Sequence, residues 1–136
     1  MQTGSNKVVV SRYFLQGLGE PNPDVVDEIF APDHVLNSPE FGMDAVEGTQ
    51  VIKDAIEGLR RDAVGVSCTI ENQIEEGDWV ATSYTISEEQ NDHMGIMISR
   101  VQDGKIAESH VVAKTVTSAE AGQRTDRIET ARRAFN

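Results

Sequence analysis

Side chains that could transfer protons recur in one stretch near the end of the chain. His110 carries an imidazole whose ordinary pKa lies near neutrality, which suits a general acid or base. Lys114 could abstract a proton next to a carbonyl group if apolar surroundings lowered its pKa, and when charged it could stabilise an enolate. The structural alternatives are a hydrogen-bonded core histidine and a lysine that reaches solvent or pairs with Glu108. His93 would neighbour Lys114, although exposure to solvent is its simpler explanation.

These residues lie on a predicted β-hairpin over residues 93–116, whose two alternating runs are joined by Asp103-Gly104. Asp-Gly between apolar runs is typical of a two-residue turn, because such a turn needs positive φ at both central residues. With this turn, Met97 lies across from His110. Since side chains alternate between the faces of a strand, one face is predicted to carry the following residues: His93, Gly95, Met97, Ser99, Val101, Ile106, Glu108, His110, Val112 and Lys114. We expect this face to be the chemical one.

Hydrophobic periodicity predicts the elements that must position the hairpin. Helices are predicted at residues 5–18, at 24–30 and from Gly48-Thr49 onward, a short strand at 34–37, a loop at 40–47, and strands at 64–74 and 79–87. A three-residue bulged loop before Trp79 would put Tyr84 and Ile86 on the same face as Ile70. Helices followed by antiparallel strands predict an α+β layer fold, in which a bent sheet wraps three helices around a cone-shaped hollow.

Size, charge and cysteine content limit the class of protein. The chain has 136 residues, which fits a single domain, 1–136, with a core of its own. Its formal net charge of −11 argues against nucleic acid and against anionic membrane surfaces, which both attract basic proteins. The single cysteine, Cys68, cannot form an internal disulfide and fits a reducing compartment. Because there is also no signal-peptide pattern and no long apolar run, we expect a cytoplasmic protein.

Metal binding is not expected from the ligand pattern. His34, His93 and His110 lie on separate predicted elements, and no two His, Cys or acidic residues have a paired ligand spacing on one face. A glycine-rich phosphate loop is missing as well. Residues 118–136 are rich in arginine and weakly helical, and we interpret them as a loose tail or an arm in a dimer.

Four short motifs, taken in order, resemble one protein family. They are Ala31-Pro32-Asp33, Asn37-Ser38-Pro39, Glu76-Gly77-Asp78 with a valine two residues on, and RVQDGKIAE over residues 100–108. Over roughly residues 5–117 the chain resembles the SnoaL-like polyketide cyclases of the nuclear transport factor 2-like superfamily. The resemblance implies an α+β cone with a deep pocket and a small, mostly apolar substrate. It also implies acid–base chemistry without a metal or an organic cofactor, and a homodimer packed through the outer sheet face.

The resemblance also assigns positions in the site. In the cyclases a histidine precedes the proline of the short strand and an aspartate lies late in the last strand, and these positions fall on Asn37 and Lys114, with His110 where the family usually has tryptophan. Limonene epoxide hydrolase, a relative, has an asparagine before the proline, but its arginine and aspartate would fall on Tyr84 and Ile86, so epoxide hydrolysis is not expected. Asn37 could hold a substrate carbonyl or a water, and Tyr84 could donate to a developing oxyanion. The alternatives are strand-end capping and core packing.

Three hypotheses follow for the function. The first is a cyclase, isomerase or hydroxylation-assisting enzyme of natural-product biosynthesis that acts on a polyketide-like or aromatic intermediate. Its acid–base groups would be His110 and Lys114, with Asn37 and Tyr84 orienting oxygens. The substrate would contact His93, Met97, Val112, Phe14, Phe30 and Ile86. The second is a non-catalytic cone that binds a small ligand or a partner protein, and the third is a dimeric interaction module built on the face with Met94, Ile96, Ile98 and Val111.

Overall fold

The computed structural model describes residues 5–117, which form an α+β fold. The first part contains helix α1 (Ser5–Arg12), the π-helical turn η1 (Tyr13–Leu18), the 3-10 turn η2 (Pro23–Val25) and helix α2 (Val26–Ile29). Then come strand β1 (Phe30–Ser38), the 3-10 turn η3 (Pro39–Phe41), strand β2 (Met43–Glu47) and helix α3 (Gln50–Asp62). Strands β3 (Ser67–Glu76), β4 (Trp79–Ser87), β5 (Asn91–Gln102) and β6 (Lys105–Thr117) complete the described part.

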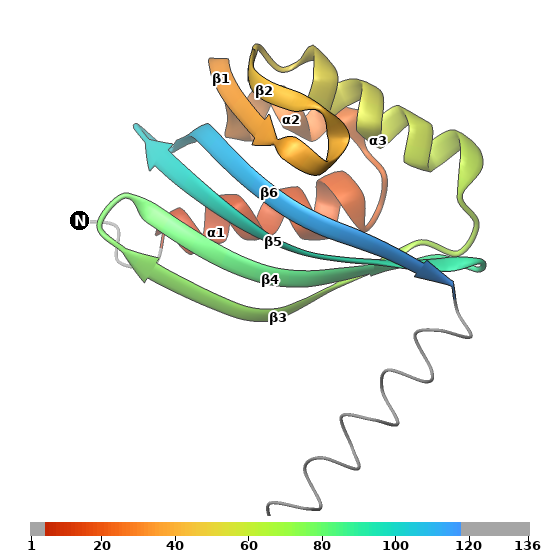
Figure 1. Ribbon diagram of the computed structural model, residues 1–136. Coiled ribbons are helices and arrows are strands. Elements are labelled where there is room, and N and C mark those ends of the chain that lie inside the picture. The colour runs from red at the N-terminus through yellow and green to blue at the C-terminus, as the bar shows by residue number, and fades with distance from the viewer. Residues whose placement is uncertain (1–4, 118–136) are drawn as a thin grey trace, which may run out of the picture.

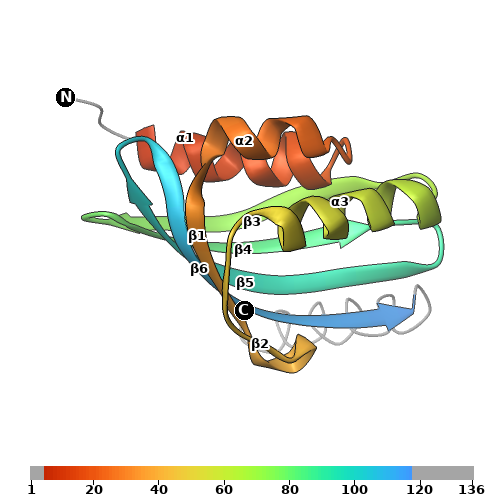
Figure 2. The ribbon, with the colours of Figure 1, turned by 90° about the horizontal axis from the view of Figure 1, so that it is seen from above.

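The six strands form one mixed sheet in the order β2-β1-β6-β5-β4-β3. Strand β1 runs parallel to β6, and every other neighbouring pair is antiparallel. The sheet is strongly bent, and the three helices lie on its concave side, here called the inner face (Figures 1 and 2). The prediction of three helices on a curved sheet is confirmed, whereas the parallel pairing of β1 with β6 was not predicted.

Residue patterns explain which side of each element faces the core. In β4 the alternation is strict, with Val80, Thr82, Tyr84 and Ile86 buried. Helix α3 presents an apolar stripe that includes the buried Ile52 and Ile56, while charged residues occupy its other side. The fully buried large side chains of the core include Phe14, Ile29, Phe30, Ile56 and Ile106.

The long hairpin forms as predicted at its turn but not along its length. Asp103 and Gly104 have positive φ values of 53° and 77°, and Val101 pairs with Ile106. The register then shifts, because Arg100 pairs with Glu108 and leaves Ala107 as an extra residue, a β-bulge. Since a shift of one residue exchanges the two faces of a strand, every later residue of β6 points to the side opposite to the predicted one.

The predicted pairing of Met97 with His110 is therefore wrong. Met97 pairs with Val111, and His110 pairs with Ile98 on the convex side of the sheet, here called the outer face. Lys114 pairs with Met94 on the same outer face. The side chains expected to form the chemical face are thus divided between two faces, with Met97 on the inner one and His110 and Lys114 on the outer one.

A second bulge lies between β3 and β4. Glu76 pairs with Trp79 across a two-residue turn, so the predicted three-residue loop is wrong. Ile70 nevertheless pairs with Tyr84, as the predicted shared face requires, because the register shifts between Ile70 and Asn72 instead. The predicted strand face was correct at this position, and the bulge that produces it lies inside the strand.

Residues 40–47 form structure where a loop was predicted. They contain η3 and strand β2, which pairs with β1 through Val35–Glu47 and Leu36–Val46. Strand β1 is also longer than predicted, because Phe30, expected at the end of a helix, is its first residue. This extra length carries β1 across the hollow beside β6.

No helix among residues 5–117 is long and apolar enough to span a membrane. The predicted tail at residues 118–136 lies outside the described residues.

Candidate functional site

A cavity of about 280 Å³ lies between the inner face of the sheet and the helices. Its walls come from η1, β1, η3, β2, α3, β5 and β6. Most of the lining is apolar, and the polar exceptions are Tyr13, His34, Ser38 and Ser109. A hollow with apolar walls and a few convergent polar groups is the usual form of a small-molecule site.

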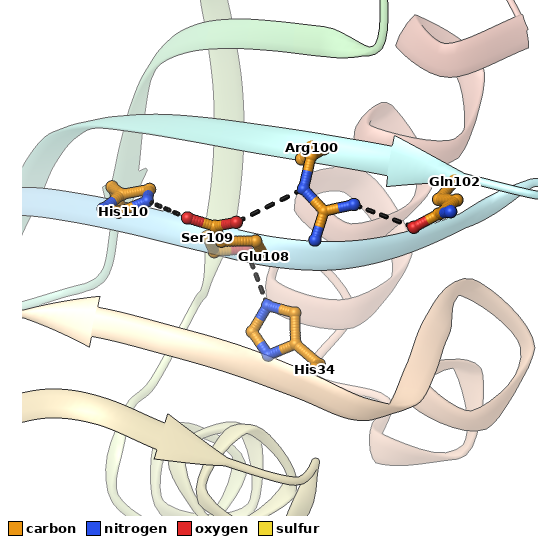
Figure 3. A network of polar contacts seen from close by, with 6 residues as sticks. All are labelled: His34, Arg100, Gln102, Glu108, Ser109 and His110. Carbon is orange, nitrogen blue, oxygen red and sulfur yellow. Dashed lines mark hydrogen bonds and ion pairs between the residues drawn. The ribbon is translucent and has the colours of Figure 1, made fainter.

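His34 is the principal polar group of this cavity. The residue is 0 % exposed, and its Nε2 lies 2.9 Å from the hydroxyl oxygen of Ser109 (Figure 3). Its other ring nitrogen, Nδ1, is buried and has no hydrogen-bond partner among the described residues. The ring packs edge-on against Phe30, with 4.9 Å between ring centroids. A buried polar atom is normally hydrogen-bonded, so this nitrogen marks a position where a ligand can bind.

Burial lowers the pKa of His34 to about 4, and the nearby carboxylates Glu108 and Asp33 only partly oppose this effect. The imidazole is therefore neutral near pH 7. In a neutral imidazole one nitrogen donates and the other accepts a hydrogen bond. If the Nε2–H group donates to Ser109, then Nδ1 presents a lone pair to the cavity and can accept a proton.

The bulge at Ala107 makes the contact between His34 and Ser109. Strand β1 runs beside β6 with Leu36 next to Ser109, and the inward side of β1 carries His34 and Ser38. Ser109 points inward only because the extra residue shifts the alternation of β6. The same feature that turns His110 outward therefore gives His34 its hydrogen-bond partner.

Two further serines complete the polar part of the inner face. The hydroxyl of Ser38 donates to the backbone carbonyl of Val111 over 3.1 Å. Ser99 lies directly across from Ser109, is 0 % exposed, and its hydroxyl has no hydrogen-bond partner among the described residues. His34, Ser109 and Ser99 thus follow one another across strands β1, β6 and β5.

Tyr13 reaches the cavity from the π-helical turn η1. In this wider turn the backbone N–H of Gly19 bonds to the carbonyl of Phe14, and the adjacent Tyr13 and Phe14 rings contact each other at 5.1 Å. Tyr13 also packs edge-on against Phe30, which contacts His34 as well. Burial raises the pKa of Tyr13, with smaller contributions from Tyr84 and Cys68, so the phenol keeps its proton.

The structure places the two predicted acid–base residues outside this cavity. His110 is exposed, its Nε2 lies 2.6 Å from a carboxylate oxygen of Glu108, and Glu108 also contacts Arg100 at 3.2 Å (Figure 3). Glu108 has a lowered pKa, mainly because of its hydrogen bond with His110. Lys114 is exposed on the same outer face. The prediction that His110 and Lys114 point into the hollow is wrong, because the bulge reverses their direction.

The two predicted oxygen-orienting residues have structural contacts instead. The side-chain oxygen of Asn37 accepts a hydrogen bond of 3.0 Å from the backbone N–H of Ala45, a residue with a positive φ of 49°. This contact matches the strand-capping alternative. Tyr84 is buried against Phe14, with 4.6 Å between ring centroids, and it does not line the cavity. Burial raises the pKa of Tyr84 to about 12, with a smaller contribution from Cys68.

Of the predicted substrate contacts, Phe30 and Met97 line the cavity. Phe14 and Ile86 belong to the core but not to the cavity lining. His93 bonds to Thr115 and Glu88 away from the cavity. Val112 is 59 % exposed on the outer face, so its predicted place in the pocket is wrong for the same reason as that of His110.

Sequence reasoning missed His34, Ser38 and Ser109 as site residues. The signal for His34 was present, since it lies on the same face as Leu36 in the predicted short strand at 34–37, and Ser38 continues that alternation one residue beyond the predicted end. For Ser109 no local signal exists, because its direction depends on the bulge. Among residues 5–117, no group of three or more His, Cys, Asp or Glu side chains is arranged to hold a metal ion.

Comparisons with known proteins agree with this fold. A family model described as a SnoaL-like domain matches residues 10–109. Among solved structures, IdmH, a candidate polyketide cyclase from Streptomyces antibioticus, superposes with a TM-score of 0.67 at 16 % identity, covering 80 % of this chain and 91 % of that one. A candidate polyketide cyclase from Acidithiobacillus ferrooxidans has a TM-score of 0.69 at 15 % identity, covering 81 % and 88 %.

A candidate ketosteroid isomerase from Kribbella flavida is also similar, with a TM-score of 0.64 at 14 % identity, covering 81 % of this chain and 78 % of that one. A comparison with curated proteins gives no match. At these identities the structural matches establish the fold, which is the predicted nuclear transport factor 2-like cone.

Proposed function

The chain belongs to the SnoaL-like domain family, and from this and from the cavity we propose that it is a cofactor-independent enzyme of the cyclase or isomerase type. It moves a proton on a small, mostly apolar carbonyl compound, such as a polyketide-like or aromatic intermediate. The acid–base group is His34, in place of the pair expected from the sequence. The similarity to candidate polyketide cyclases and to a candidate ketosteroid isomerase supports this reaction class.

One observation carries the proposal, the buried and unpartnered Nδ1 of His34 in an apolar cavity. A general base must be unprotonated and within hydrogen-bond reach of the proton that it removes. His34 meets the first condition because its imidazole is neutral at neutral pH. For the second condition, we propose that a ligand filling the cavity meets Nδ1, because His34 is one of the residues that line it. Ser109 holds the opposite nitrogen and stabilises the imidazolium that forms.

The low basicity of His34 indicates which proton it can remove. A base with a pKa of about 4 takes protons efficiently only from acidic carbon, such as a carbon between two carbonyl groups or one between a carbonyl group and an aromatic ring, as in 2-tetralone. The phenol of Tyr13 lines the same cavity and stays protonated, so it is the candidate donor to the oxygen on which negative charge develops. Intermediates with alternating carbonyl groups satisfy both requirements.

Proton exchange provides a test that does not need the natural substrate. 2-Tetralone, a neutral two-ring ketone, is incubated with the protein in D2O, and exchange next to the carbonyl is followed by proton NMR. The native protein should accelerate exchange, and His34→Gln should reduce the acceleration about a hundredfold or more. His110→Gln, which changes a histidine on the outer face, is the matched control and should keep the native rate. Equal rates in the two variants would refute His34 as the base.

A non-catalytic ligand-binding protein is the second candidate. The observation that favours it is the weak basicity of His34, together with a lining that contains no Asp, Glu, Lys or Arg. In that case the protein binds 2-tetralone and leaves its exchange rate unchanged.

A further inference from the structure

The cavity has no charged side chain in its wall. Among the described residues, the ionisable groups that line it are His34 and Tyr13, and both are neutral at neutral pH. A carboxylate or phosphate that entered would lose its hydration without meeting a cation. The absence of a cation in the wall therefore disfavours the binding of anionic ligands.

Exposed carboxylates stand next to cavity-lining residues in the chain. Phe41 and Ala55 line the cavity and are also exposed, so they mark where it opens to solvent. Their neighbours in the chain include Glu40 on η3 and Asp54 on α3, and Asp44 follows the cavity-lining Met43 on β2. All three carboxylates are exposed. The net charge of −11 of the whole chain also disfavours the approach of an anion.

Two lysines on elements that wall the cavity, α3 and β6, do not supply a cation to it. Lys53 on α3 is paired with Asp27, with 3.0 Å between the ammonium and a carboxylate oxygen. Lys114 borders a separate surface hollow, which it shares with Glu40 and with outer-face residues such as Ile96. Neither lysine lines the cavity.

The size of the cavity sets a second limit. Its volume of about 280 Å³ is just below the range of about 300–1,000 Å³ that is usual for drug-sized ligands. One or two fused rings fit this space, whereas a four-ring skeleton exceeds it. Because Nδ1 of His34 is a buried acceptor without a partner among the described residues, a ligand with an N–H or O–H group on an otherwise apolar body can satisfy it.

We propose that the cavity takes an uncharged ligand of one or two rings and excludes its carboxylate and phosphate forms. This inference rests on the proposed function only in treating the cavity as the substrate site. It implies that the substrate reaches the protein as a neutral molecule. A reaction that masks the acid group, such as esterification, must therefore come first.

Binding of three probes tests the inference without any reaction. 2-Naphthamide and 2-naphthoate have nearly the same shape, but the first is neutral and the second is an anion at pH 7. Pyrene-1-carboxamide keeps the amide and doubles the number of rings. By isothermal titration calorimetry, 2-naphthamide should bind, and 2-naphthoate and pyrene-1-carboxamide should each bind about a hundredfold more weakly or not at all.

Two tryptophan variants locate the binding. Ala55→Trp fills the mouth of the cavity from an exposed helix position and should abolish binding of 2-naphthamide. Val112→Trp adds the same ring to the outer face and should leave binding unchanged. Because both positions are exposed, neither variant disturbs the core.

The outcomes separate this inference from the proposed function. Equal binding of the amide and the acid, tight binding of the pyrene amide, undiminished binding to Ala55→Trp, or no binding of any probe would overturn the inference. The proton-exchange result with 2-tetralone would stand in each of these cases. Conversely, selective binding of 2-naphthamide without any exchange of 2-tetralone would support the ligand class and refute the acid–base role.

Discussion

Burial of His34 predicts a pH dependence of stability that one substitution can isolate. An ordinary histidine has a pKa of 6.5, whereas burial lowers the pKa of His34 to about 4 in the folded protein. Between these values the unfolded chain binds a proton that the folded chain does not bind, so stability falls as the pH falls. The loss begins near pH 6.5 and is complete below about pH 4.

The size of the effect follows from the two pKa values. One pKa unit corresponds to about 1.4 kcal/mol, so the full loss is about 3 kcal/mol, of which about 2 kcal/mol falls between pH 7 and pH 5. This is a large fraction of the 5–15 kcal/mol that is typical for the whole stability of a domain. The effect is therefore measurable by ordinary denaturation.

Urea unfolding at pH 7, 6 and 5 measures the effect in the native protein, in His34→Phe and in His110→Gln. His34→Phe has no titrating group at this position and should lose about 2 kcal/mol less than the native protein between pH 7 and pH 5. Protonation of the many carboxylates and the loss of the partner of Ser109 affect the absolute stability, but neither changes this difference in pH dependence. His110→Gln should keep the native pH dependence between pH 7 and pH 5, because Glu108, whose pKa is lowered by its hydrogen bond with His110, titrates below this range. If His34→Phe and the native protein respond equally to pH, then His34 is not buried as described.

Three further results are expected. Ser109→Ala leaves the imidazole of His34 without its partner and should lower the free energy of unfolding by about 1–3 kcal/mol, while the double variant with His34→Phe should recover most of this loss in the same urea assay. Gly95→Ala should lower the free energy of unfolding by about 1–3 kcal/mol, because a Cβ at this position would lie 2.6 Å from the hydroxyl of Tyr84. An unchanged thermal unfolding temperature would count against this crowding. We also predict a homodimer through the outer sheet face, where Ile98 is 43 % exposed. Light scattering should give twice the chain mass of 14.9 kDa for the native protein and the mass of a monomer for Ile98→Lys. A monomeric native protein would contradict this prediction.

The fold was predictable where local signals agree with one another. Three elements had such a signal: a turn dipeptide at Asp103-Gly104, alternating polarity in the strand Trp79–Ser87, and helical periodicity in the helix that follows Thr49. Few other structures would satisfy these patterns. The face of Tyr84 was also predictable, because both sides of its strand differ clearly in polarity. The family motifs added the cone as a whole.

The direction of the side chains in β6 was not predictable in the same way. In β6, apolar residues occur at both even-numbered and odd-numbered positions, for example Ile106 and Val111. Either alternation of side chains would therefore bury some of them. A pattern that is apolar on both faces specifies register only weakly. In the structure Ile106 and Val111 both belong to the inner side, and their odd spacing requires the extra residue at Ala107. Only contacts with β1 and the helices decide this, and they come from distant parts of the chain.

The role of His34 was obscured for a related reason. Its burial depends on the parallel pairing of β1 with β6, which joins residues more than 70 positions apart in the sequence. Residue type drew attention to His110 and Lys114, because they lie on the strongest hairpin signal. Residue type alone does not determine which of several histidines loses contact with water.

The single extra residue at Ala107 decides which side chains of β6 face the interior of the protein. One amino acid in β6 determines whether the hollow contains Ser109 and Val111, or instead His110, Val112 and Lys114. A chain with the same side chains but without that residue would present an amine and a second imidazole to its ligand in place of a serine-supported neutral base. In such hairpins the number of residues between the turn and the site matters as much as their identity. Inserting or deleting one residue exchanges the side chains that face the cavity and so changes the chemistry of the site.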